Sequence, residues 1–284
     1  MNGDTSNPDG EGSELAGPGR SRVGLPARAL ALALSMGACG PVGGEPGPGS
    51  DEASITVFAA SSLTEAMTAL GHAYESSRPG TRVVLTFGGS QILRLQISQG
   101  AAADAFASAN EAHLTSLISE GTAQRSQVLA TNALALIVPR GLDGPVASFE
   151  DLPRAQRIVI GSSAVPIGAY TRLLLDRTEV HFGPRFRQDV LDRVVSEESN
   201  VRLVRAKVEL GEADAAFVYS TDALASDRSE IITIPPDVNV HPRYVIGGMT
   251  NAPSPRGRDA FLTWLQTAPA RDILRAHGFS VPNG

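Results

Sequence analysis

Short apolar runs alternate with segments of helical spacing over the whole chain beyond residue 54. The runs lie at residues 55–59, 82–87, 104–107, 134–139, 157–160, 213–219 and 243–246. Most are followed by a stretch with apolar residues every three or four positions, which predicts an amphipathic helix. Strands and helices in this order predict a mostly parallel sheet with helices on both faces.

The alternation occurs in two series, which indicates two α/β lobes. We expect residues 54–131 together with 244–284 to form the first lobe and residues 132–243 to form the second. A cleft between two such lobes, beyond the carboxyl ends of the strands, is where ligands usually bind.

Two hydroxyl-bearing loops follow strands of the first lobe. Ser61 and Ser62 come after the first strand, and Ser90 follows Gly88-Gly89 after the second. Each loop opens a helix, whose start presents unpaired N–H groups and the positive end of the helix dipole. These are the parts needed to hold a small oxyanion without a fixed cation.

The second lobe offers matching donors. Ile167 and Val201 stand at predicted helix starts, and Tyr219 ends a predicted strand. With Ser62 and Ser90 they would form a ring of neutral donors suited to a tetrahedral oxyanion. Each residue alone has an ordinary explanation, as a helix cap, a turn or a core tyrosine. The hypothesis therefore depends on their joint placement.

Composition excludes several classes of function. The net charge is −6 and no Lys/Arg run occurs, so nucleic acid is not an expected partner. The five histidines are scattered, and no motif of a serine hydrolase, zinc protease or P-loop enzyme is present. We therefore expect neither an enzyme nor a cofactor.

The N-terminal region, residues 1–39, is predicted to be an export signal. Three arginines precede the short apolar run at 29–34, which is too short to span a bilayer. Gly37-Ala38-Cys39 resembles a bacterial lipobox, in which the cysteine is acylated, although Met36 stands where leucine is usual. Ordinary signal cleavage nearby is the alternative. Residues 40–53 are rich in Gly and Pro and predict a tether.

A series of short motifs carries a family resemblance. They are TVFAASSL at 56–63, FGGS at 87–90, ADAFASA at 103–109, NAL at 132–134, VPIGAY at 165–170, VR at 201–202, GEAD at 211–214 and FVY at 217–219. In this order they resemble the substrate-binding proteins of bacterial molybdate ABC transporters. The resemblance implies a type II periplasmic-binding-protein fold, with mixed, mostly parallel sheets and a ligand cleft at the hinge.

The resemblance also implies the ligand and its contacts. The oxygens of molybdate, or of tungstate, would be bound by Ser62, Ser90, the N–H groups of Ile167 and Val201, and Tyr219, with Ser61 as an additional donor. No separate metal site or cofactor is implied. The protein would be a monomer in the periplasm or at the outer face of the cytoplasmic membrane, held there through Cys39. Its partner would be a membrane-embedded permease with its ATPase.

The sequence is also compatible with receptors for other ligands. Sulfate and phosphate are also tetrahedral, and the sequence cannot separate them from molybdate. A ferric-ion receptor would need two neighbouring tyrosines, and Tyr219 has none beside it. An amino-acid receptor would place a cation against the ligand, whereas Arg202 is expected on a solvated face or in a contact between the lobes.

Overall fold

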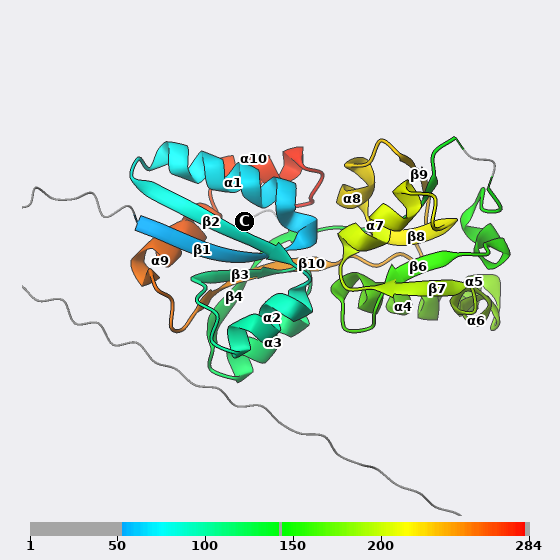
Figure 1. The fold of residues 1–284 in the computed structure, drawn as a ribbon, viewed down its shortest axis with the longest axis horizontal. Coiled ribbons are helices and arrows are strands. Elements are labelled where there is room, and N and C mark those ends of the chain that lie inside the picture. Colours follow the sequence, from blue (N-terminus) through cyan, green and yellow to red (C-terminus); the bar gives the residue numbers. More distant parts are fainter. Residues whose placement is uncertain (1–52, 142–143, 282–284) are drawn as a thin grey trace, which may run out of the picture. The chain divides into compact units, whose positions relative to one another are not determined.

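The computed structural model describes residues 53–141 and 144–281 (Figure 1). The predicted export signal, Cys39 and nearly all of the tether lie outside the described residues. The described chain contains two five-stranded sheets, each with helices packed against it. No helix in the described ranges is long and apolar enough to cross a membrane.

The first sheet has the strand order β2-β1-β3-β10-β4. Its strands are β1 (Ala53–Ala60), β2 (Thr81–Gly88), β3 (Ala105–Ser108), β4 (Ala123–Thr131) and β10 (Arg243–Met249). Only β10 runs against the others. The helices of this lobe are α1 (Thr64–Ser77), α2 (Ser90–Ser98), α3 (Glu111–Ser119), α9 (Pro255–Trp264) and α10 (Ala268–Ala276). Figure 1 shows α1 and α10 on one side of the sheet and α2 and α3 on the other.

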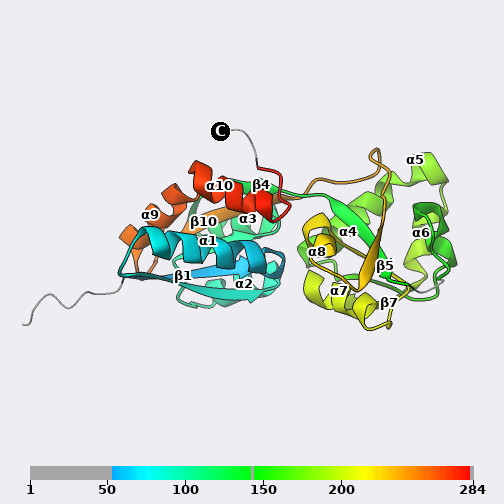
Figure 2. The same ribbon diagram turned by 90° about the horizontal axis from the view of Figure 1, so that it is seen from above.

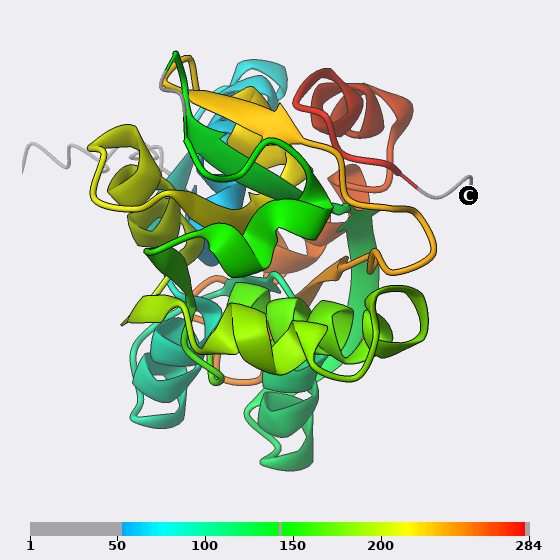
Figure 3. The same cartoon turned by 90° about the vertical axis from the view of Figure 1, so that its right-hand side faces the viewer.

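The second sheet has the order β7-β6-β8-β5-β9. Its strands are β5 (Leu134–Pro139), β6 (Ile158–Gly161), β7 (Val194–Glu198), β8 (Ala215–Tyr219) and β9 (Ser229–Ile232). Here β5 alone runs against the rest. The helices are α4 (Pro166–Arg177), α5 (Glu179–Phe182), α6 (Phe186–Leu191), α7 (Val201–Glu209) and α8 (Ser220–Leu224). Figure 3 turns this sheet toward the viewer.

The chain passes between the two sheets twice. Residues 132–133 connect β4 to β5, and residues 233–242 connect β9 to β10. Figure 2 shows both connections running side by side. The side chain of Asn132 is fixed in the first connection, since its Nδ2 donates to Thr221 Oγ1 at 2.9 Å and its Oδ1 accepts from Ala133 N–H at 2.9 Å.

All seven apolar runs predicted as strands are strands, with ends shifted by at most a few residues. The sequence pattern missed β4, β7 and β9, and all three lie at sheet edges. An edge strand needs less apolar surface than a central one and often carries charged residues. In β7, for example, the sequence is Val-Val-Ser-Glu-Glu and alternate residues are exposed.

Candidate functional site

One small cavity lies where four helix starts and the end of a strand come together. It is lined by Ala60, Ser61, Ser62, Gly88, Gly89, Ser90, Ala109, Val165, Pro166, Ile167, Asn200, Val201 and Tyr219. All six residues predicted from the sequence are in this set, three from each lobe. The structure therefore brings the predicted site residues together.

Residues at four helix starts line this cavity. The short 3-10 turn Ser61–Leu63 leads into α1, and α2 begins at Ser90; neither start has a side-chain cap. In α4 the first helical residue is Pro166, which has no N–H, and no side chain caps the turn. The N–H of Ile167 is therefore the first backbone donor of this helix. Each helix also contributes the positive end of its dipole.

At the start of α7 a side chain selects which N–H remains free. Asn200 Oδ1 accepts from Arg202 N–H at 3.0 Å and from Leu203 N–H at 3.2 Å. These bonds satisfy the second and third donors of the helix, as an N-cap does. The first donor, the N–H of Val201, is left to face the cavity.

Ser90 is held so that its proton is available. Its side chain is buried, and Oγ accepts a hydrogen bond from Ala109 N–H at 3.2 Å. A serine hydroxyl has one proton and two lone pairs. Because the protein donates to Oγ, the Ser90 proton can point into the cavity.

Tyr219 presents a hydroxyl that the protein does not use. It is buried at the end of β8, beside the Tyr244 hydroxyl, yet among the described residues its Oη has no hydrogen-bond partner of normal geometry. Burial raises the pKa of Tyr219 well above its ordinary value, so the phenol stays protonated. A buried donor without a partner is costly, which suggests that a ligand completes it.

No charged side chain lines the small cavity. Its volume is about 10 Å³, close to what one water-sized sphere requires. Such a space is too small for an organic ligand. The described residues hold no group of three or more His, Cys, Asp or Glu side chains that could bind a metal cation. The donor set fits a small oxyanion held by dipoles and hydroxyl groups.

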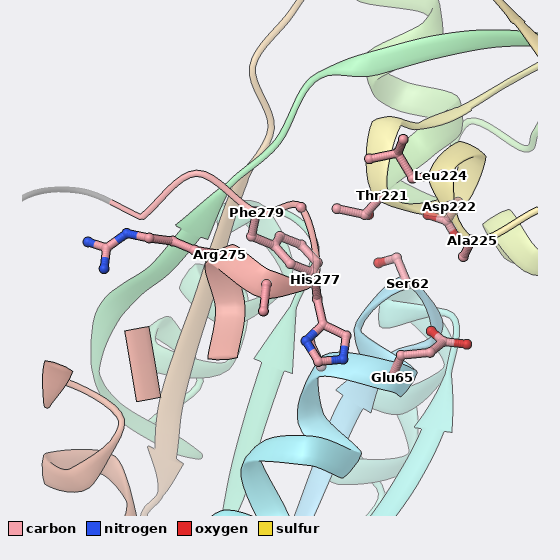
Figure 4. A pocket seen from close by; sticks show the side chains of 12 residues that line it. Ser62, Glu65, Thr221, Asp222, Leu224, Ala225, Arg275, His277 and Phe279 are labelled. Carbon is pink, nitrogen blue, oxygen red and sulfur yellow. The ribbon is translucent and has the colours of Figure 1, made fainter. Parts of the chain in front are cut away.

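A larger cavity of about 310 Å³ lies next to the first and shares Ser62 with it (Figure 4). Its carboxylates are Glu65 and Asp222, and burial raises the pKa of Asp222 to about 7. Arg275 points away from this space and pairs with Asp272 at 2.8 Å. The C-terminal end of α10, which carries partial negative charge, also borders it. These features disfavour an anion, so the smaller cavity is the candidate oxyanion site.

The sequence pattern did not lead us to predict two features of the site. Asn200 precedes an amphipathic segment, which is a recognised signal for a helix cap. Tyr244 has a hydroxyl 3.1 Å from Ser62 Oγ, across 182 positions of sequence. No local pattern could have indicated that contact, because the sequence around Tyr244 indicates only a buried strand.

Comparison with known proteins adds independent information. The family model of bacterial extracellular solute-binding proteins matches residues 55–280. The molybdate-binding protein ModA of Mycobacterium tuberculosis is 34% identical over 257 residues, which cover 88% of this chain and 95% of that protein. YvgL of Bacillus subtilis, a candidate substrate-binding lipoprotein of an ABC transporter, is 31% identical, with 80% of this chain and 86% of YvgL covered.

Solved structures show the same two-lobe fold. The periplasmic molybdate-binding protein of Azotobacter vinelandii superposes with a TM-score of 0.68 at 20% identity, covering 81% of this chain and all of that chain. The sulfate-binding protein SubI of Mycobacterium tuberculosis gives a TM-score of 0.72 at 16% identity, covering 80% of this chain and 86% of that chain. At these identities the structural likeness establishes the fold alone.

Proposed function

Since this chain belongs to the bacterial extracellular solute-binding proteins, and within them to the molybdate-binding ModA family, we propose that it binds molybdate in the small cavity and delivers it to an ABC transporter. The family consists of solute-binding transport proteins, and the chain is not an enzyme. The observation that carries the proposal is the convergence of four helix starts and four hydroxyl-bearing residues on a cavity without charged side chains.

The contacts follow from the donors around the cavity. Hydroxyl groups of Ser62, Ser90 and Tyr219 and the N–H groups of Ile167 and Val201 donate to the anion, with Ser61 as an additional donor. Hydrogen bonds to a charged group are each worth about 1.5–3 kcal/mol. Several of them, with the helix dipoles, offset the loss of hydration of a dianion. Tungstate has the same shape and charge and is a second ligand.

Binding closes the two lobes over the anion. We assign residues 54–131 and 244–284 to the first lobe and residues 132–243 to the second. The two connections between the sheets, at 132–133 and 233–242, act as the hinge. Donors from both lobes reach the anion together only in the closed form, so the anion favours that form.

The place of action follows from the N-terminal sequence. Residues 1–39 direct export, Cys39 is acylated, and residues 40–53 tether the folded part to the membrane. The protein works as a monomer in the periplasm or at the outer face of the cytoplasmic membrane. There it passes the anion to a membrane-embedded permease with its ATPase. Mass spectrometry of the protein isolated from membranes tests the acylation directly.

A thermal-shift series tests the ligand. The chain lacking residues 1–39 is heated with molybdate, tungstate, sulfate or phosphate. Ligand at about 100 times its Kd adds about 2.7 kcal/mol to stability, which is roughly 5–11 °C in Tm for a protein of this size. We expect this shift with molybdate and tungstate and none with the other two. A shift with sulfate or phosphate alone would change the ligand, and no shift with any of them would refute the proposal.

A further inference from the structure

Tyr244 lies where the chain returns from the second sheet to the first. It is the second residue of β10 and is fully buried. The pairing of β10 with β4 changes register between Tyr244 and Val245, an irregularity of the kind that redirects a side chain. Tyr244 does not line the oxyanion cavity, although its hydroxyl reaches a residue that does.

The direction of one hydrogen bond can be worked out. Tyr244 Oη lies 3.1 Å from Ser62 Oγ, and the Asn132 amide and the Tyr219 hydroxyl are the other polar groups beside the phenol. The hydrogen bond with Asn132 acts to lower the pKa of Tyr244, which is the effect of a donor, so Asn132 turns its amide N–H toward the phenol oxygen. Burial raises the pKa of Tyr244 well above its ordinary value, so the phenol keeps its proton. Of the two neighbouring hydroxyls, Ser62 Oγ is the one at normal hydrogen-bond geometry, so it is the acceptor of that proton.

The ring of Tyr244 supports a second site residue. It packs edge-on against Tyr219, with ring centroids 5.5 Å apart, and its other aromatic neighbour is Phe279, with ring centroids 5.2 Å apart. Tyr219 belongs to the second lobe and Ser62 to the first. Tyr244 therefore touches one hydroxyl donor from each lobe without touching the cavity itself.

We propose that Tyr244 is a positioning residue that determines which oxyanions the site accepts. Its hydroxyl donates to Ser62 Oγ and thereby directs the Ser62 proton to the bound anion. Ala109 N–H does the same for Ser90. In each serine one lone pair is taken by a protein donor, and that donor holds the hydroxyl so that its proton faces the anion. A fully deprotonated anion such as molybdate can accept both protons, whereas hydrogen phosphate, which carries a proton of its own, meets the proton side of each hydroxyl.

This inference rests on the proposed function. A double-mutant cycle tests the role of Tyr244 separately from molybdate binding itself. Molybdate affinity is measured by titration calorimetry for the wild type, Ser62→Ala, Tyr244→Phe and the double variant. We expect Tyr244→Phe to raise Kd about tenfold in the wild type and by less than about threefold when Ser62 is already alanine. A purely structural role would give the same factor in both backgrounds.

A selectivity measurement adds a readout that packing alone would not change. In Tyr244→Phe the Ser62 hydroxyl is no longer held by a donor and can turn a lone pair toward a protonated anion, so the ratio of phosphate Kd to molybdate Kd should fall by about tenfold or more. Tyr74→Phe is the matched control, because Tyr74 is an equally buried tyrosine that packs on Phe261 and Trp264. It should leave both affinities unchanged.

Each possible result bears either on the role of Tyr244 or on the proposed function. Equal effects of Tyr244→Phe in both backgrounds, or no effect in either, would overturn the positioning role. Failure of the folded wild type to bind molybdate would instead refute the proposed function. The fitted stoichiometry reports the fraction of folded protein, so partial misfolding of a variant lowers that number and leaves Kd interpretable.

Discussion

The Nε atom of Arg202, in the second lobe, donates to the main-chain oxygen of Ser61 in the first lobe at 2.9 Å. The same guanidinium pairs with Glu65. Burial by itself would raise the pKa of Glu65, but the hydrogen bond and charge of Arg202 hold it below its ordinary value. Arg202 thus joins the two lobes at the rim of the oxyanion site, which is one of the two roles expected for it from the sequence.

Replacing Arg202 should weaken molybdate binding. In Arg202→Ala the closed form loses a charge-assisted hydrogen bond worth about 1.5 kcal/mol, which corresponds to roughly tenfold in Kd. The exposed pair with Glu65 adds little. The control is Arg187→Ala, which breaks the ion pair of Arg187 with Asp176 inside the second lobe. Equal Kd values for the two variants would contradict the link between Arg202 and closure.

Removing the Ser90 hydroxyl should affect both binding and stability. Ser90→Ala loses one hydrogen bond to the anion, about 1.5–3 kcal/mol, and leaves the buried Ala109 N–H without an acceptor, about 1–3 kcal/mol. Calorimetric titration gives the first value and urea unfolding without ligand gives the second. Ser98→Ala, in the same helix but paired with Glu120 at the surface, should change Kd very little. Unaltered Kd in Ser90→Ala would remove Ser90 from the site.

Tyr219→Phe should stabilise the ligand-free protein while weakening binding. The variant deletes a buried hydroxyl that has no partner among the described residues, so about 1 kcal/mol of desolvation cost is relieved. The bound anion loses a donor at the same time. A rise in Tm without molybdate, together with a higher Kd, is the expected pair of results. A drop in both Tm and affinity would show that the hydroxyl serves the fold.

Gly89→Ala should obstruct closure. A Cβ at Gly89 would lie 2.4 Å from the main-chain oxygen of Ser199 in the other lobe. The backbone of Gly89, with φ −63°, is open to any residue, and the Gln91 side-chain amide, 2.7 Å from the added Cβ, is a flexible end that can move, so the main-chain oxygen of Ser199 is the obstacle. We expect a loss of about 1–3 kcal/mol in binding. Gly71→Ala, whose Cβ would have ordinary contacts at 3.6 Å, should bind like the wild type.

Asp222 should make stability fall as the pH rises from about 4 to about 7. Its pKa is raised to about 7 in the folded protein by burial, against the partial compensation of Arg205 and Arg202, with Glu65 adding to the rise. A raised pKa means that the folded state binds the proton more tightly, so the stabilisation is present below pH ~4 and is lost as pH approaches 7. The upper limit is about 4 kcal/mol.

Urea unfolding at several pH values checks this slope. Asp222→Asn should flatten it and should be more stable than the wild type above pH ~7. Asp151 gives the opposite sign, because its hydrogen bonds with Ser148 lower its pKa and its contribution is lost as the pH falls. A wild-type curve parallel to that of Asp222→Asn would show that Asp222 does not carry the effect.

The positions of the site residues could be predicted because each follows a local rule. Ser62 and Ser90 come directly after apolar strands and open helices, and Tyr219 ends a buried run. The carboxyl ends of neighbouring parallel strands meet at one sheet edge. Asn110 also acts locally, since its Oδ1 caps α3 by accepting from His113 N–H at 3.3 Å.

What the sequence could not predict are the contacts between distant segments. Arg202 and Ser61 are 141 positions apart, and Tyr244 and Ser62 are 182 apart. Such pairs depend on how two lobes meet, which periodicity within one segment does not record. The edge strands β4, β7 and β9 were not predicted, for a related reason. Each pairs with a single neighbouring strand and borders solvent, so its sequence lacks the apolar run of a central strand.

The place of β10 in the first sheet sets an order of assembly. Strand β4 pairs only with β10 among the described strands, and β10 also separates it from β3. The second sheet is complete once Ile232 has been made, whereas the first still lacks its antiparallel strand until Met249. The half of the chain that emerges first is therefore the one that finishes last. A product that stops before residue 243 could form the second lobe, yet the lobe that carries Ser62 and Ser90 would have no completed sheet on which to display them.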